Sequence, residues 1–354
     1  MKINTDCRYF KGDMPCIYHK ERNVHCWKCE YYERINKRIL IIKLGAAGDV
    51  VRTTPLLRKI KQLYRDAEVT WISHFPELVP SMVDSILNFE LKNILYLINK
   101  PFDIVVNLDK DKEACALVNI IHAKRKKGFK LENGKVVPID SQANKKWLTG
   151  LFDDVNLKNK KSYVQEIFQI FGAQFNGEKY VLEKTSNKSW NIQKSSPLIG
   201  LNTGCGDRWK TRLWPEEYWI KLVKLLKISG YEVLLLGGEK EDNKNKGISQ
   251  KTNACYFGHF PLEDFISLID QCDLVVTGVT LAMHLAIGLG KKIALFNNVF
   301  NRHEFELYNL GEIIEPEVPC RGCFKPICNE PCMEKIDPKR VFQTCVKLLN
   351  IKTK

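Results

Sequence analysis

The chain has 354 residues, too many for one typical hydrophobic core and enough for two α/β domains. Its hydrophobic fraction of 44% and charged fraction of 27% indicate a soluble globular protein. No window approaches the roughly 18 apolar residues of a membrane span, and the first residues lack the apolar core of a signal peptide. We therefore expect a cytoplasmic protein.

Lysines and arginines number 55 and acidic residues 41, which gives a net charge of +14. Such a charge favours a polyanionic partner: a nucleic acid, an anionic lipid or a phosphorylated substrate. A solvated surface explains most single lysines equally well. The basic clusters, however, all lie in the first half, at residues 124–127, 145–146 and 158–161. This asymmetry favours an anionic partner for that half.

Residues 1–35 form a cysteine-rich N-terminal extension with little periodicity, and an alternation of strands and helices begins at Arg38. The predicted strands are Arg38–Leu44, Glu68–Ser73 and Phe102–Leu108, and the predicted helices are Thr54–Tyr64, Lys112–Ile121 and Ser162–Phe171. A hairpin is predicted over Lys127–Pro138, with its turn at Asn133-Gly134. These elements predict a Rossmann-like domain over residues 36–185.

A polar connection over residues 172–197 separates this domain from a second Rossmann-like domain, predicted over residues 190–315. Its predicted strands are Leu198–Asn202, Glu232–Leu236, Asp273–Thr277 and Lys292–Phe296, and its predicted helices are Pro215–Ser229, Glu239–Gln250, Pro261–Gln271 and Thr280–Leu289. Pro215 and Pro261 are predicted at first helical positions. Residues 316–354 form a second cysteine-rich segment with a final helix over Pro338–Leu349.

The most informative stretch runs from Arg38 to Pro55. A short apolar strand leads into a turn with two glycines and one carboxylate, that of Asp49, before a helix begins. Ligands of open α/β sheets bind at the carboxyl ends of strands, so Asp49 is a candidate catalytic base, with Lys43 and Arg52 beside it. Aspartate is also a common helix N-cap, which is the alternative role.

Four segments resemble those of glycosyltransferase family 9, the heptosyltransferases. They are residues 39–55, 199–217, 234–239 and 272–284. Each is modest alone, and their order and spacing are specific. The resemblance implies a GT-B type α/β fold with two Rossmann-like domains facing a cleft. It also implies an inverting transfer from a nucleotide-activated heptose, usually ADP-heptose, to a lipopolysaccharide-core acceptor.

The resemblance places the general base at Asp49, with Lys43 and Arg52 on the acceptor side. It implies a donor site for the nucleotide diphosphate in the second half, formed by Thr203, Lys210, Arg212, Glu239, Thr280 and His284. Glu241 is an alternative to Glu239. The basic residues of the loop 207–212 and the turn 277–280 suit a diphosphate, because cations and helix N-termini stabilise phosphate charge. His284, within an apolar helix, also fits a packing role.

The fourth segment departs from the family pattern. The family usually has an aspartate and then Thr/Ser-Gly-Pro before Met-His, whereas this chain has Val279-Thr-Leu-Ala before Met283-His284. The missing acid normally contacts the donor sugar, so its loss affects the choice of sugar more than the nucleotide-sugar class. Glu304 and Asn298 are candidates to replace it.

Eight of the thirteen cysteines are clustered at the ends of the chain. The two sets are Cys7, Cys16, Cys26 and Cys29, and Cys320, Cys323, Cys328 and Cys332. Each set has four thiols and one Cys-x-x-Cys, which suits structural zinc or an iron–sulfur cluster. Disulfides are disfavoured in a reducing cytoplasm. No cofactor is expected for the transfer itself.

The expected partners are a nucleotide-sugar donor and an anionic, lipid-linked glycan acceptor at the inner face of the cytoplasmic membrane. Peripheral contact with anionic lipid would use the basic first half. A nucleic-acid-binding protein with zinc clusters is the alternative, but it leaves Asp49 and the paired α/β halves without a purpose. No nucleic acid is therefore expected. A redox or iron–sulfur protein would leave the four segments unexplained.

Overall fold

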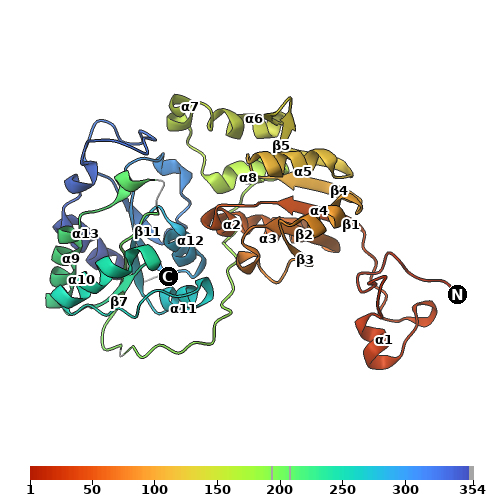
Figure 1. The fold of residues 1–354 in the computed structure, drawn as a ribbon, viewed down its shortest axis with the longest axis horizontal. Coiled ribbons are helices and arrows are strands. Elements are labelled where there is room, and N and C mark those ends of the chain that lie inside the picture. The colour runs from red at the N-terminus through yellow and green to blue at the C-terminus, as the bar shows by residue number, and fades with distance from the viewer. Residues whose placement is uncertain (193, 207–208, 351–354) are drawn as a thin grey trace. The chain divides into compact units, whose positions relative to one another are not determined.

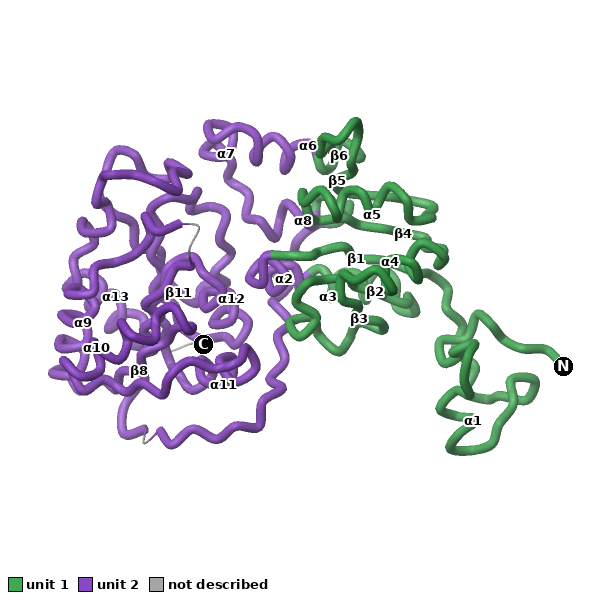
Figure 2. Tube along the Cα trace, viewed as in Figure 1, with its two compact units in different colours: residues 1–45, 56–143, 169–173 green, residues 46–55, 144–168, 174–354 purple. Residues whose placement is uncertain are grey.

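The computed structural model describes residues 1–192, 194–206 and 209–350. The chain packs as two compact units, coloured separately in Figure 2. The N-terminal unit comprises residues 1–45, 56–143 and 169–173, and the C-terminal unit comprises residues 46–55, 144–168 and 174–354. No helix in the described part of the chain is long and apolar enough to cross a membrane.

The N-terminal unit is built on a six-stranded sheet in the order β3-β2-β1-β4-β5-β6 (Figure 1). The strands are β1 (Lys37–Ile42), β2 (Ala67–Ser73), β3 (Ser85–Asn88), β4 (Phe102–Asn107), β5 (Ala123–Glu132) and β6 (Lys135–Pro138). All neighbours pair in parallel except β5 and β6. These two form the predicted hairpin, and its turn residues Asn133 and Gly134 both have positive φ.

Helices α3 (Pro55–Leu63), α4 (Leu91–Ile98) and α5 (Lys112–Ile120) connect these strands. Leu40 and Val105 of the sheet share a core with Leu117 and Val118 of α5. The cysteine-rich extension contains only a short helix, α1 (Ile17–Arg22), and a 3₁₀ turn at Cys26–Lys28.

The C-terminal unit is built on a five-stranded, all-parallel sheet in the order β11-β10-β9-β7-β8. The strands are β7 (Leu198–Asn202), β8 (Glu232–Leu236), β9 (Leu274–Gly278), β10 (Lys292–Phe296) and β11 (Gly311–Ile314). Every residue of β7 and β9 is buried, as expected for strands covered on both faces. The predicted α/β architecture with two parallel-sheet domains is confirmed.

The helices of this unit are α9 (Glu216–Ile228), α10 (Asp242–Thr252), α11 (Leu262–Asp270), α12 (Leu281–Gly288) and α13 (Pro338–Asn350). Helices α9 and α13 share one core with the sheet. Trp214 and Trp219 meet edge to face in that core, with ring centroids 4.8 Å apart. The final helix thus completes the core of the C-terminal unit.

Two segments from the first half pack with the C-terminal unit. One is α2 (Ala47–Thr53), and the other contains most of α6 (Ser141–Leu148), all of α7 (Asp153–Lys158) and most of α8 (Tyr163–Phe171). The two units therefore interleave along the chain. This places residues 46–55 of the opening motif, including Asp49, in the same unit as the three family-like segments that follow it in the chain.

Most predicted elements are found within two residues of their predicted ends. The prediction that Pro215 and Pro261 occupy the first helical positions was wrong. Both are the N-cap residues, one position before their helices begin. The predicted helix from Glu239 begins as a 3₁₀ turn and becomes α-helical at Asp242. Seven α-helices and strands were not predicted from the sequence, and all are short, with 4–8 residues each: α1, α2, α4, α6, α7, β3 and β11.

Candidate active site

Asp49 lies in the first turn of α2, and Ala46 occupies the N-cap. The N-cap role for Asp49 is therefore wrong. The Asp49 side chain is 31% exposed, and its Oδ1 atom lies 2.9 Å from Nη2 of Arg52. Residues three apart share a face of a helix, so this pair follows from the local sequence. The carboxylate is paired and still open to solvent, as a base that must meet a substrate has to be.

Arg52 is held on several sides within the C-terminal unit. Its guanidinium carbon lies 3.5 Å from the centre of the Tyr163 ring, and its Nη1 atom lies 3.8 Å from Oε1 of Glu304. Burial opposes the charged guanidinium, but Asp49 and Glu304 outweigh it and hold the pKa of Arg52 above its usual value. Arg52 thus remains charged and ties the candidate base to the loop after β10.

His284 of α12 lies against α2. A Cβ atom added to Gly48 would stand 2.5 Å from Cδ2 of His284, so only glycine allows this approach. The His284 ring is buried, and its Nδ1 atom lies 3.4 Å from the hydroxyl of Tyr180. Burial, helped by the charge of Arg52, lowers the pKa of His284 to about 3. The imidazole is therefore neutral and serves the packing of the two helices.

Polar side chains meet where β7 and β9 end. The amide nitrogen of Asn202 donates to the hydroxyls of Thr277 and Thr280, at 3.1 and 3.3 Å. Thr280 stands at the N-cap of α12. This edge is the carboxyl end of a parallel sheet, where ligands of α/β proteins bind. Thr280 is thus placed at a ligand-binding edge, together with Asn202, which the sequence analysis did not identify.

Thr203 follows directly and is buried. Its hydroxyl donates to the side-chain oxygen of Asn245 at 2.7 Å, and its carbonyl accepts from Nζ of Lys244 at 2.8 Å. Burial lowers the pKa of Lys244. Lys244 therefore adds a cation to the loop after β7, besides the predicted Lys210 and Arg212, and it was not identified from the sequence.

Arg212 ties the loop after β7 to the turn after β9. It donates through Nη1 to the carbonyl of Val279 and through Nη2 to the carbonyl of Cys205. Its Nε is buried and has no hydrogen-bond partner among the described residues. Lys210 is exposed on the same loop, and residues 207 and 208 lie outside the described residues. The two predicted cations of this loop therefore differ: Arg212 is held by backbone carbonyls, whereas Lys210 faces solvent.

The two glutamates after β8 are placed differently. Glu239 is exposed, whereas an Oε2 atom of Glu241 accepts from the backbone N–H of Gly238 at 3.0 Å. A Cβ atom added to Gly204 would stand 2.4 Å from the carboxyl carbon of Glu241. Glu241 thus lies against the loop after β7, whereas Glu239 is exposed.

Lys43 was predicted to face the acceptor, but it is buried in the N-terminal unit. Its Nζ donates to Asp109 and to the carbonyl of Gly45. Asp109 also accepts from the backbone N–H groups of Leu44 and Gly45. A buried lysine with these partners could reach a substrate only by breaking its ion pair, so the structure favours a role in holding residues 43–45.

All thirteen cysteines lie in the described part of the chain, and none of them forms a disulfide. Among the described residues, no three His, Cys, Asp or Glu side chains converge closely enough to hold a metal ion as they stand. The thiols of the N-terminal set nevertheless line one cavity. At the C-terminal set, Cys332 accepts a hydrogen bond from the Asn298 amide at 3.1 Å. Asn298 is thereby engaged in structure, and its proposed replacement of the missing acid gains no support.

Comparison with known proteins decides the family. The model of "glycosyltransferase family 9 (heptosyltransferase)" matches residues 94–333. The chain belongs to glycosyltransferase family 9. A stretch of 111 residues of this family member is 28% identical to lipopolysaccharide heptosyltransferase 2 of Salmonella typhimurium. That match covers 29% of the chain and 32% of the relative, so the chain spans about a third of this curated protein.

Solved structures share the fold of this family-9 chain over most of its length. A family 9 glycosyltransferase from Veillonella parvula aligns with a TM-score of 0.69 at 18% identity, covering 90% of this chain and 98% of its own. The ADP-heptose lipopolysaccharide heptosyltransferase II of E. coli aligns with a TM-score of 0.62 at 17% identity, covering 88% and 98%. The iron-containing heptosyltransferase TibC aligns with a TM-score of 0.57 at 13% identity, covering 88% and 76%. These likenesses confirm the GT-B type fold.

Several residues of the site had a visible signal in the sequence. Asn202 ends an apolar strand, and Asp109 follows the end of another, so both are polar side chains at carboxyl ends. Tyr163, Tyr180 and Lys244 had no such signal, because each lies far along the chain from its contact and is brought there by packing.

Proposed function

We propose that the protein is an inverting glycosyltransferase with Asp49 as the general base. It moves a heptose or related sugar from a nucleotide diphosphate donor, ADP-heptose in the first instance, to a lipopolysaccharide-core or other glycan or lipid acceptor. Membership of the family supports the reaction class. The observation that carries the assignment of the base is the solvent-open carboxylate of Asp49 within the opening motif.

The proposed step needs one base and no covalent intermediate. Asp49 takes the proton of the acceptor hydroxyl, and the oxygen attacks the anomeric carbon from the face opposite the diphosphate. The bond between the anomeric carbon and the diphosphate oxygen breaks, and the nucleotide diphosphate leaves with the electron pair. Arg52 positions Asp49 through its 2.9 Å ion pair.

The donor diphosphate is proposed to bind at the carboxyl edge of the C-terminal sheet. Thr280 and Thr203 border this edge, and the half-buried Arg212 brings to it a cation whose buried Nε–H has no partner among the described residues. Lys210 approaches from solvent, Glu241 or Glu239 faces the nucleoside, and His284 supports the site by packing. Fixed donors and cations in a partly dry site stabilise a leaving diphosphate.

The sugar is the least constrained part of the proposal. Val279 stands where the family usually has an acid, and Glu304 is the carboxylate that the structure brings to Arg52. Glu304 is therefore our candidate to contact the sugar in place of the missing acid.

The setting of the reaction is also a proposal. We expect the protein to work in the cytoplasm, peripherally at an anionic membrane face that carries the acceptor, and not on nucleic acid. The transfer is proposed to need no cofactor. Structural zinc or an iron–sulfur cluster at the eight terminal cysteines remains a separate prediction.

A thermal-shift screen with ADP-, GDP- and UDP-sugars, followed by an assay of nucleotide release with acceptor, tests the function. ADP-heptose should stabilise the protein and release ADP only when acceptor is present. Arg212→Ala should raise the donor KM or lower kcat, and Lys210→Ala should do so less. Tight, salt-dependent RNA or DNA binding without transfer would overturn the proposal, and unchanged kinetics in both variants would remove the two cations from the site.

A further inference from the structure

The cysteine-rich extension has no hydrophobic core. No side chain of residues 1–38 is buried, and neither α1 nor the turn at Cys26–Lys28 contributes a buried residue. Several large apolar side chains face solvent instead: Ile3, Phe10, Met14, Ile17, Trp27 and Tyr32. Segments below about 40 residues usually need disulfides, metals or oligomerisation to hold a fold. Some other interaction must therefore organise this extension.

Backbone pairing closes the extension into a loop. Cys7 and Arg34 form an antiparallel bridge. On either side of it, the N–H of Arg8 donates to the carbonyl of Glu33, and the N–H of Ile35 donates to that of Asp6, both at 2.8 Å. The chain between them returns to its starting point, which brings the first cysteine of the set near the last.

The interior of this loop is a cavity of about 250 Å³. All four cysteines of the N-terminal set line it, together with the imidazoles of His19 and His25. Aromatic rings form much of the remaining lining. The ring centroids of Tyr18 and Tyr31 lie 4.3 Å apart in a stacked pair, and those of His25 and Trp27 lie 4.5 Å apart in another. Six potential soft-metal ligands thus surround a space that the extension's own side chains leave unfilled.

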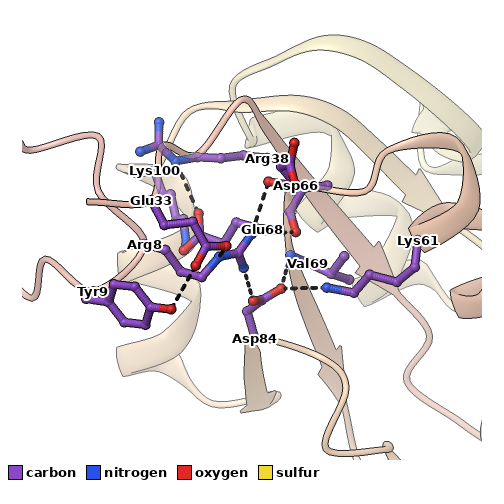
Figure 3. Close-up of polar contacts among 11 residues, drawn as sticks. Arg8, Tyr9, Glu33, Arg38, Lys61, Asp66, Glu68, Val69, Asp84 and Lys100 are labelled. Carbon is purple, nitrogen blue, oxygen red and sulfur yellow. Dashed lines mark hydrogen bonds and ion pairs between the residues drawn. The ribbon is translucent and has the colours of Figure 1, made fainter. Parts of the chain in front are cut away.

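Arg8 anchors this loop to the N-terminal unit (Figure 3). Its Nε atom pairs with Glu33 at 2.8 Å, its Nη1 atom pairs with Asp84, and its Nη2 atom donates to the carbonyl of Asp66 at 3.0 Å. Asp84 also accepts from the N–H of Val69 in β2, at 2.8 Å. The extension therefore has a fixed attachment that does not depend on its cysteines.

We propose that Cys7, Cys16, Cys26 and Cys29 bind a thiolate-ligated metal centre that serves as the core of the extension. Each thiol releases its proton to solvent as its sulfur binds the metal, so folding of the extension is coupled to metal uptake. A tetrahedral Zn²⁺ ion and an iron–sulfur cluster share this ligand chemistry. The four thiols, all in the described part of the chain, line one space without converging closely enough to hold a metal ion, so binding must draw them together.

The role is structural and independent of glycosyl transfer. The anchor residues and the ligand set all lie in the N-terminal unit, whereas Asp49 belongs to the C-terminal unit. Failure of this inference would leave the proposed transfer untouched, and the reverse holds as well.

The test uses the full-length protein purified without oxygen. Elemental analysis for zinc and iron, with visible absorption for an iron–sulfur cluster, compares the wild type with Cys26→Ser/Cys29→Ser. The variant should lose one metal centre per chain. Cys255→Ser, which changes a thiol outside both sets, is the matched control and should retain it. Zinc without visible absorption identifies the ion, and iron with sulfide identifies the cluster.

Limited trypsin digestion supplies a readout that does not depend on the variants folding. Removing metal from the wild type with a chelator should speed cleavage at Lys20, Arg22 and Lys28 while the α/β units stay intact, and restoring the metal should reverse this. Equal metal content in the wild type and Cys26→Ser/Cys29→Ser would overturn the proposal. So would an intact mass showing disulfides among the four cysteines, or digestion unaffected by chelation.

Discussion

Two ion pairs each use a basic residue of the opening motif, and they have opposite surroundings. Lys43 pairs with Asp109, and their side chains are 2% and 6% exposed. Arg52 pairs with Asp49, and their side chains are 12% and 31% exposed. The first carboxylate accepts hydrogen bonds from its own loop, whereas the second keeps a face open to solvent. Exposure, not residue type, distinguishes a structural carboxylate from a candidate base.

The pKa of Asp109, in the buried pair with Lys43, agrees with a structural role for this carboxylate. Burial raises the pKa of Asp109, and the charge of Lys43 only partly opposes the effect. A carboxylate that has lost its water and is committed to Lys43 and two N–H groups cannot be offered to a substrate. Asp109 therefore contributes to the shape of the strand end, and Asp49 remains our candidate for the general base.

Asp49→Asn should have the largest effect on activity. Loss of a general base typically lowers the rate by about 10²–10⁴-fold, and the fold should survive because Asp49 is not a helix cap. Steady-state transfer kinetics and thermal unfolding measure the two effects separately. Asp154→Asn, which changes an exposed aspartate in α7, is the matched control and should leave both unchanged. Near-wild-type turnover by Asp49→Asn would remove it from the mechanism.

Asp109→Asn should mainly cost stability. Breaking a buried pair leaves Lys43 charged and uncompensated, and such losses are about 3–5 kcal/mol in the free energy of unfolding. Chemical denaturation of the variant measures the loss. The double change Lys43→Met/Asp109→Leu should recover much of it, because an apolar replacement of both partners removes the unpaired charge. If the single variant were as stable as the wild type, the two ion pairs would not differ in the way we describe.

Gly48→Ala tests the contact that places α2 beside α12. The added methyl group would overlap His284, and overpacking of this kind costs about 1–3 kcal/mol. Activity should fall too, because Asp49 is the next residue. Gly247→Ala is the matched control, since that helical glycine has open space around its Cβ position. It should stabilise the protein by about 0.5–1 kcal/mol, and equal effects in the two variants would argue against the tight contact.

His284 predicts a smaller, pH-dependent effect. Above pH 6.5 the imidazole is neutral in both the folded and the unfolded chain. As the pH falls, the unfolded imidazole takes up a proton first, so stability declines from pH 6.5 down to about 3, where the folded group titrates. His284→Gln should flatten this part of the stability profile, measured by denaturation at several pH values. Parallel profiles for the two proteins would show that His284 titrates normally.

The sequence was most informative where a signal is local. The apolar runs and glycine-marked ends located most strands of both sheets, and Asn133-Gly134 located the hairpin turn. The same local logic identified Asp49, because it is the one carboxylate in the glycine turn that follows a predicted strand. Short elements such as α2 and β3 were missed, because so few residues carry little periodicity.

The sequence by itself thus determined the fold class, the family motifs and the residue types of the site. Only the tertiary structure decided which charged side chains are buried in structural ion pairs and which remain accessible to solvent. Packing buries the ion pair of Lys43 and Asp109 and holds Arg212 by hydrogen bonds to backbone carbonyls. It places Glu241, but not Glu239, against the loop after β7. It also brings Glu304 and Tyr163 into contact with Arg52. The physical reason is that desolvation and pairing are set by neighbours distant in the chain, and residue order alone does not encode those distances.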